Sequence, residues 1–225
     1  MLASFHNARA GVTLWRAHLG HSWRTIEEDN SIADLPTAFP TSRMKPRNHR
    51  ALEGRKGIPY LYLSTTSMAA MSEVRPWIGA FVSVAQFQII QEVKIVDCSS
   101  LHGQYFNLAF GKRRFTAEGL MQPDDSEVDQ IVWAAIDTAF AEPITHSYDV
   151  ADCAATQIIA ELFRTEGHDG VAYKSAFGAE GYSVVLFDLD KARQINGMLY
   201  KVESVDFKFT DSAVDLYTVK DDDPV

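Results

Sequence analysis

A strand signal that runs directly into a helix signal, over residues 57–75, constrains the fold of this chain more than any other feature. Residues 60–64 are apolar and aromatic, which favours a strand, and the threonines and serine that follow can cap a helix. We expect that helix to continue to about Arg75, because a proline comes next. Tyr62 of the strand and Glu73 of the helix therefore belong to adjacent elements, and the sequence predicts that both face one pocket.

Strand and helix signals continue along the chain without regular alternation. Strands are predicted at residues 12–17, 81–90, 93–96, 170–173, 182–187 and within 198–209, and helices at 126–140 and from 149 or 152 to 165. The second of these helices is expected to turn Ile158, Ile159, Leu162 and Phe163 inward. Residues 19–56 are expected to form a long polar connection, because three prolines break any helix. This order of elements predicts an α+β fold rather than a doubly wound parallel sheet.

Size, charge and hydropathy limit the class of protein. A chain of 225 residues that is 46% apolar can bury a sizeable core, and we expect one domain over residues 1–225. No apolar run reaches the ~18 residues that a membrane span needs, and the start lacks the pattern of a signal peptide, so the sequence predicts a cytoplasmic protein. The net charge of −9 argues against broad nucleic-acid binding, which requires a basic surface.

Glu73 is the ionisable residue whose setting is most unusual. Its neighbours on the predicted helix are small or apolar, so its carboxylate would be partly desolvated and would need a partner, or its pKa would rise. One interpretation is an exposed glutamate beside Arg75. The other is an acid that stabilises positive charge developing in a ligand, as when a glycosidic bond breaks through an oxocarbenium-like transition state.

Three further residues have both a structural and a functional interpretation. Arg16 is the one charged residue of its apolar strand, and it is either an exposed strand arginine or a guanidinium that holds a pyrophosphate or carboxylate with two hydrogen bonds. Tyr62 is either a core aromatic or a ring that stacks on a flat ligand. Ser175 follows a strand and is a turn residue by itself, although Gly178 and Gly181 nearby permit close approach of the backbone to a ligand.

A basic run with one acid, Glu53, lies in the predicted connection. Its basic residues are Arg43, Lys45, Arg47, Arg50, Arg55 and Lys56. The run is either a solvated loop or an anion-binding flap beside a phosphate-bearing ligand. No glycine-rich phosphate loop, nucleophile elbow or zinc-binding helix motif is present, and His18 and His21 lack companions for a metal site, so no metal is expected.

An ordered set of segments resembles the RES domain family. The segments are residues 14–17, 53–55 and 57–62, Glu73 eleven residues after Tyr62, and residues 156–161, 167–175 and 181–188. No single segment is specific, but together they follow the order of the family from about residue 12 to 190. The extra length of this chain then lies in insertions near residues 19–52 and 99–125.

The resemblance implies an ADP-ribosyltransferase-like fold, in which two small, mostly antiparallel sheets flanked by helices form an NAD cleft. It implies an enzyme that cleaves the nicotinamide–ribose bond of NAD, as an NAD phosphorylase or glycohydrolase, and a bacterial toxin of a toxin–antitoxin pair. NAD is then a substrate, with inorganic phosphate as a co-substrate, and no cofactor is needed. The implied partner is an Xre-type helix-turn-helix antitoxin that blocks the cleft. The resemblance does not decide whether the protein forms a homodimer, and it implies neither direct binding of nucleic acid nor association with a membrane.

The resemblance also assigns roles to residues of this chain. The catalytic residues become Glu73, Tyr62, Arg55 and Ser175, and the NAD-binding residues become Arg16, Arg43, Tyr62 and Ser175. The loop after Arg55 is about three residues shorter than is usual in the family, which leaves Arg43 and Arg47 as alternatives. Because this loop is short, a catalytically inactive domain that binds a nucleotide or a partner remains an alternative. A protein ADP-ribosyltransferase is the other alternative, because phosphate, water and a protein side chain all remain as acceptors.

Overall fold

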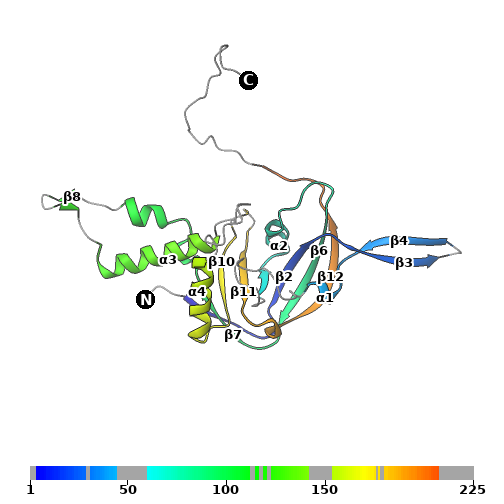
Figure 1. Ribbon diagram of the computed structural model, residues 1–225, viewed down its shortest axis with the longest axis horizontal. Helices are drawn as coiled ribbons and strands as arrows, with labels where there is room; N and C mark the ends of the chain where they lie inside the picture. The colour runs from blue at the N-terminus through cyan, green and yellow to red at the C-terminus, as the bar shows by residue number, and fades with distance from the viewer. Residues whose placement is uncertain are drawn as a thin grey trace, which may run out of the picture.

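The computed structural model describes residues 4–28, 31–44, 60–111, 115–116, 119–120, 123–141, 154–175, 177 and 180–207. Its centre is an eight-stranded sheet in the order β1-β7-β10-β11-β5-β2-β6-β12 (Figure 1). The strands are β1 (Ser4–Ala8), β2 (Thr13–Leu19), β5 (Leu61–Ser64), β6 (Phe81–Ile89), β7 (Val93–Asp97), β10 (Gly170–Lys174), β11 (Tyr182–Leu186) and β12 (Ala192–Lys201). Neighbouring strands are antiparallel except β7 and β10. The predicted α+β class is confirmed.

The sheet has a narrow junction between β5 and β2. These two strands share a single pair of facing residues, Trp15 and Ser64. By contrast, β6 pairs with β2 along all of β2, and β11 pairs with β5 along all of β5. The resemblance to the RES family implied two small sheets, whereas hydrogen bonds join the two parts here into one sheet. The junction still divides it into β2, β6 and β12 on one side and the other five strands on the other.

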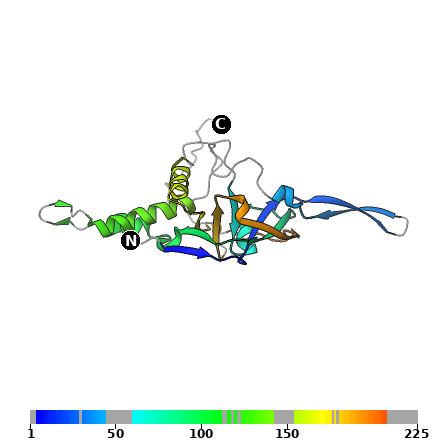
Figure 2. The ribbon, with the colours of Figure 1, turned by 90° about the horizontal axis from the view of Figure 1, so that it is seen from below.

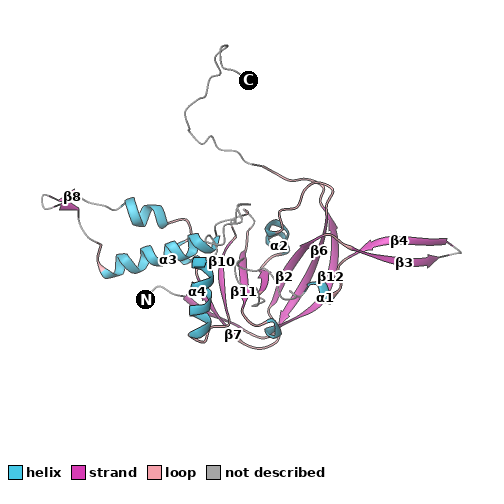
Figure 3. Cartoon of the chain, in the orientation of Figure 1, coloured by secondary structure: helices cyan, strands magenta, loops and turns pink. Residues whose placement is uncertain are grey.

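Alternating side chains of the strands build a core on each face of the sheet. On one face, Leu61, Leu63 and Leu186 pack with Phe39, and with Met44 of α1 (Thr41–Met44). On the opposite face, a second core lies under α3 (Asp125–Ala141) and α4 (Ala154–Thr165). Its members include Tyr60, Tyr62, Val171 and Val185 of the sheet and Trp133, Phe140 and Phe163 of the helices. Figure 3 shows α3 and α4 together beside β10.

The prediction of a long polar connection over residues 19–56 was wrong where the structure describes it. β3 (Ser22–Glu28) and β4 (Ser31–Thr37) form an antiparallel hairpin that projects from the body (Figures 1 and 2). Pro36 lies within β4 opposite Trp23. A proline is tolerated there because each strand of an isolated hairpin has an open edge, so the missing N–H breaks no ladder.

The prediction of which face of α4 points inward needs correction. α4 turns Ala160 and Phe163 inward, but Ile158 and Leu162 are 70% and 56% exposed, so half of the predicted inward face looks outward. The four apolar residues form a stripe wider than the contact that one helix makes with a sheet. α4 ends as predicted at Thr165, Gly167 just beyond it has a φ of +83° that suits glycine, and the His168 N–H donates to Phe163 O.

The remaining described elements are short. After β7 come η1 (Ser99–Leu101), the π-helical turn η2 (Asn107–Gly111) and the strand pair β8 (Phe115–Thr116) and β9 (Gly119–Leu120); η3 (Leu189–Lys191) precedes β12. β12 begins earlier than the predicted range of 198–209. No helix within the described parts of the chain is long and apolar enough to cross a membrane.

Candidate active site

α2 (Ser67–Glu73) covers the junction of the sheet, because it lies against β2, β5, β6 and β11. The Thr66 side chain caps the helix and accepts a hydrogen bond from the Ala69 N–H at 3.1 Å. Ala69 and Ala70 are buried, and their small side chains allow α2 to approach the strands closely. The helix ends two residues before the predicted Arg75, which adopts a left-handed φ of 46°. The adjacent strand and helix that the sequence predicted are thus present.

The connection from β10 to β11 holds the start of α2. Thr66 Oγ1 donates to Glu180 O at 3.0 Å, and the Tyr182 N–H donates to Thr65 Oγ1 at 2.9 Å. Gly181 has a φ of +141°, and a Cβ there would lie 3.0 Å from Thr66 Oγ1. The close approach that the sequence predicted toward a ligand is therefore made, at Gly181, to the chain itself. Gly178 lies outside the described residues.

Arg16 of β2 reaches across the junction. Its Nη1 donates to Tyr62 O of β5 at 3.0 Å, so a side chain joins the two strands where their backbones barely pair. The Nε atom is buried and has no hydrogen-bond partner among the described residues. Burial lowers the pKa of Arg16 to about 10, because desolvation disfavours the charged guanidinium, and an interaction with Tyr62 offsets only part of this. Arg16 is thus a buried cation whose charge a bound anion could compensate.

Glu73 has the partner that its burial requires. Ser183 Oγ of β11 donates to Glu73 Oε1 at 2.8 Å, and Ser183 is 3% exposed. Ser183 faces Tyr173 across the β10–β11 pair. The pKa of Tyr173 is raised, first by burial and then by the negative charge of Glu73, while an interaction with Ser183 partly opposes the rise. Glu73 and Ser183 are thus hydrogen-bonded, and Tyr173 faces Ser183 from the adjacent strand.

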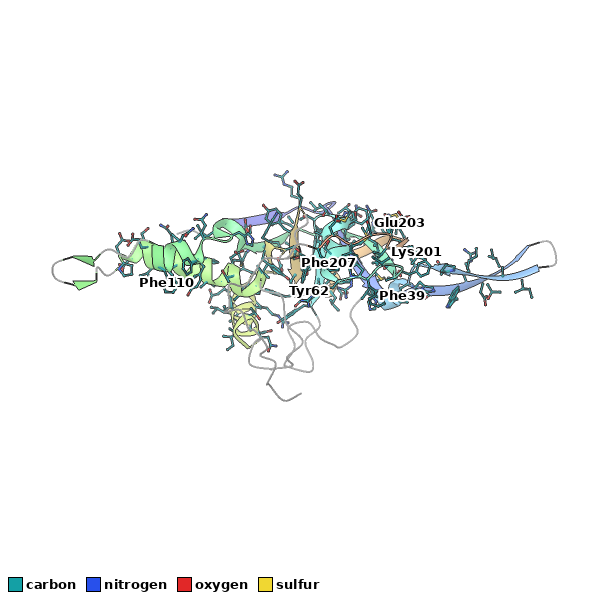
Figure 4. All side chains as sticks on the ribbon, turned by 90° about the horizontal axis from the view of Figure 1, so that it is seen from above. Phe39, Tyr62, Phe110, Lys201, Glu203 and Phe207 are labelled. Atoms are coloured by element: carbon teal, nitrogen blue, oxygen red, sulfur yellow. The ribbon has the colours of Figure 1, made fainter. Side chains whose placement is uncertain are left out.

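Tyr62 belongs to the same face of the sheet as this group. It pairs with Val185, which is two residues from Ser183 on β11, and its half-buried side chain packs against the core under α3 and α4. Figure 4 shows Tyr62 in the central body of the molecule, far from Phe110 on the projecting helical part. The structure thus joins Arg16 to Tyr62 and carries Glu73 on the helix that lies against the strands of both.

Ser175 follows β10 directly and is 5% exposed. Its hydroxyl accepts a hydrogen bond from the Phe177 N–H at 3.2 Å, which is the turn geometry that a serine commonly supports. The Arg75 guanidinium lies 4.7 Å from the centre of the Phe177 ring. Ser175 is therefore two residues from Phe177, which contacts Arg75 just beyond the end of α2.

The basic run is mostly outside the described residues. Arg43 belongs to α1, but nothing is described of its side chain, and Arg47 and Arg55 lie wholly outside. Their assignment to NAD binding or catalysis stays a prediction.

An apolar cavity of about 360 Å³ lies on the other face of the sheet. It is lined by aliphatic side chains that include Leu14, Ile95, Val184 and Leu186. These residues belong to the core opposite α3 and α4, so the cavity is separate from Glu73 and Ser183.

Sequence reasoning missed Tyr173 and Ser183 as members of the site. A signal was present, because Ser183 is the one polar residue in the otherwise apolar run 183–187. A lone polar residue in a buried strand needs a hydrogen-bond partner, and the nearest carboxylate is a candidate for it.

Comparison with known families identifies the class of protein. A model of the RES domain matches residues 13–210, which include Arg16, Tyr62, Glu73 and Ser175. Because the match covers most of the chain, the chain belongs to the RES domain family. This family is associated with toxin–antitoxin systems that act on NAD. No curated protein and no solved structure gives a significant match.

Proposed function

We propose that this RES domain cleaves the nicotinamide–ribose bond of NAD, as an NAD phosphorylase or glycohydrolase. The observation that carries the proposal is that one junction of the sheet carries both a fixed carboxylate on the helix that covers it and a guanidinium whose buried Nε has no partner among the described residues. Glu73 is held by Ser183, and α2, which carries it, lies against the strand of Arg16. NAD presents an anionic pyrophosphate and a cationic nicotinamide-ribose, which suit these two charges. An ADP-ribosyltransferase-like fold, with NAD bound across the junction, is part of the same proposal.

Glu73 acts on the charge that develops at the ribose. As the bond between C1′ and the nicotinamide nitrogen breaks, its electron pair goes to that nitrogen, so nicotinamide leaves as a neutral molecule. The ribosyl carbon becomes positively charged, and a carboxylate beside it stabilises the transition state. Phosphate or water then forms the new bond to C1′, and the proton of water passes to the carboxylate or to solvent.

Arg16 binds the pyrophosphate. A guanidinium forms two parallel hydrogen bonds to phosphate oxygens, and Nε is one of the two donors that this geometry uses. The Nε of Arg16 is buried and has no partner among the described residues, so an anion would both satisfy the donor and compensate the charge. Tyr62, next to Arg16, stacks on or hydrogen-bonds the nicotinamide side.

The other assigned residues complete the proposal. Ser175 hydrogen-bonds the ribose or the carboxamide, and Arg43 and Arg55 contact the phosphates from the basic run, with Arg47 as the alternative. The protein acts as a toxin in the cytoplasm, and an Xre-type antitoxin blocks the cleft. A homodimer is compatible with this proposal, but the proposal does not require one.

The test is an incubation of the purified protein with NAD and phosphate, with and without cell extract. The expected products are free nicotinamide and either ADP-ribose-1″-phosphate or ADP-ribose. ADP-ribose attached to a protein of the extract would instead identify an ADP-ribosyltransferase. Intact NAD under all conditions would overturn the proposal and favour a domain that binds without turnover. Glu73→Gln protein serves as the control for a contaminating activity.

A further inference from the structure

Two polar side chains of neighbouring strands have no role in the function proposed above. Ser183 of β11 donates a hydrogen bond to Glu73 of α2, and Tyr173 of β10 faces Ser183 across the strand pair. We propose that Ser183 and Tyr173 are positioning residues, which hold the Glu73 carboxylate in one orientation toward the ribose of the bound dinucleotide. This inference rests on the proposed function, because it takes the role of Glu73 from there.

Ser183 occupies a position where the pattern of the strand calls for an apolar residue. β11 lies between β10 and β5, and the four residues that follow Ser183 are apolar and buried. A hydroxyl at 3% exposure costs free energy unless it is hydrogen-bonded. Its bond to Glu73 Oε1, at 2.8 Å, satisfies that requirement. The polar group at this position is therefore accounted for by its contact with Glu73.

The direction of the hydrogen bonds follows from the number of protons. An ionised carboxylate can only accept, and a serine hydroxyl has one proton to donate. Ser183 gives that proton to Glu73, and Tyr173 faces Ser183 across the β10–β11 pair. Burial and the charge of Glu73 raise the pKa of Tyr173, so Tyr173 stays protonated and uncharged beside Ser183 at neutral pH.

The two ends of this arrangement are fixed by different elements. At one end, the Tyr173 ring stacks on Phe140 of α3, with 5.7 Å between ring centroids and 25° between the planes. At the other end, Ser183 holds Oε1 of Glu73, which leaves Oε2 as the oxygen for the ligand. A carboxylate held by one oxygen keeps its plane fixed while the ribose gains charge. Preorganisation of this kind lowers the barrier without adding affinity for the substrate.

The test compares kcat and KM for three variants of the full chain. We expect Ser183→Ala to lower kcat by ~10-fold or more, the loss typical of a hydrogen bond to a charged group, and to change KM by less than about twofold. We expect Tyr173→Phe to lower kcat by about threefold, because it removes a hydroxyl from the surroundings of Ser183 and not from the carboxylate itself. Ser183→Thr keeps the hydroxyl and should restore most of kcat. The control is Ser83→Ala, which removes a buried hydroxyl that bonds Gly20 O and the Phe39 N–H elsewhere, and it should leave kcat unchanged.

A double variant separates positioning from an independent effect. In a Glu73→Gln background, Ser183→Ala should cause almost no further loss of kcat, because it acts through the carboxylate. A further tenfold loss there, or wild-type kcat in both Ser183→Ala and Tyr173→Phe, would overturn this inference and leave the proposed function intact. Absence of turnover by the wild type would overturn both. If Ser183→Ala does not fold, Tyr173→Phe decides alone, since it removes a single hydroxyl.

Discussion

The two faces of the central sheet are built from the same strands and both carry an apolar core, but only one of them also carries the polar side chains beside Glu73. On β5, Leu63 joins an entirely apolar core, while its neighbour Tyr62 lies on the face of Ser183, Tyr173 and Glu73. On β11, Val184 likewise joins the apolar core, while its neighbour Ser183 faces Glu73 on the other side of the sheet. Because successive strand residues point to opposite faces, a single short strand can serve stability and chemistry separately. Substitutions on one face should therefore affect stability, and those on the other should affect turnover.

The largest effect is expected on the apolar face. Leu63→Ala removes a side chain that is 2% exposed and should lower the free energy of unfolding by about 2–5 kcal/mol, measured by chemical denaturation. The kcat of the protein that remains folded should stay near that of the wild type. Ile158→Ala is the control, because Ile158 is 70% exposed on α4 and should change stability little. A large loss in both variants would contradict the orientation of α4 described above.

On the opposite face, Glu73→Gln should affect turnover rather than stability. We expect turnover to fall by ~10²-fold, the loss typical when a group placed at developing charge is removed, with a small change in the unfolding midpoint. NAD consumption and chemical denaturation measure the two effects. Glu166→Gln, at an exposed residue just beyond the end of α4, is the matched control. Near wild-type turnover in folded Glu73→Gln protein would remove Glu73 from the mechanism.

Arg16 sharpens the comparison, because it acts at the junction rather than in either core. Arg16→Lys keeps a positive charge but loses the planar fork, so NAD binding should weaken by about 1–3 kcal/mol. Isothermal titration with the Glu73→Gln protein as background avoids turnover during the measurement. Arg24→Lys, on the exposed strand β3, should leave affinity unchanged. Equal affinity in both variants would mean that Arg16 only joins the two strands.

The smallest effect concerns Asp137, a fully buried acid of α3. Its Oδ2 lies 2.8 Å from His102 Nδ1, and burial raises its pKa above the ordinary 3.8, although His102 partly opposes this and Asp97 adds to it. Folding therefore favours the protonated form, so the stability of the wild type falls as pH rises from 3.8 through the folded-state pKa. Asp137→Asn removes this titration.

The measurement for Asp137 is the free energy of unfolding across a pH series. Relative to the wild type, Asp137→Asn should gain stability as pH rises above 3.8 and then reach a plateau. Asp129→Asn, an exposed acid of the same helix, should show no such gain. Parallel pH profiles for wild type and Asp137→Asn would show that Asp137 pays no desolvation cost.

Local signals were enough to predict much of the fold. The strands β5, β6, β7, β10 and β11 were predicted because each is a short apolar run bounded by turn residues. The placement of Tyr62 and Glu73 on adjacent elements followed from one continuous segment. The hydrogen bond from Arg16 to Tyr62 O could not be predicted in this way, because it depends on β2 meeting β5, and the two residues are 46 positions apart in the chain.

The failures have physical causes that can be named. The β3–β4 hairpin was missed because Pro36 argues against a strand unless that strand lies at an edge, and the edge is a property of the whole sheet. Ser183 was missed because its function depends on Glu73, 110 residues away. The inward face of helix α4 was predicted wrongly because its apolar residues cover more than one side of the helix.

The single pair of residues between β5 and β2 also has a mechanical consequence. A sheet resists bending through its ladder of hydrogen bonds, so its angular stiffness is lowest where that ladder is shortest. The line of lowest stiffness here runs under α2, between the strand of Arg16 and the strand of Tyr62. A ligand that binds residues of both strands would restrict bending along this line. The angle between the two parts of the sheet would then depend on whether the ligand is bound.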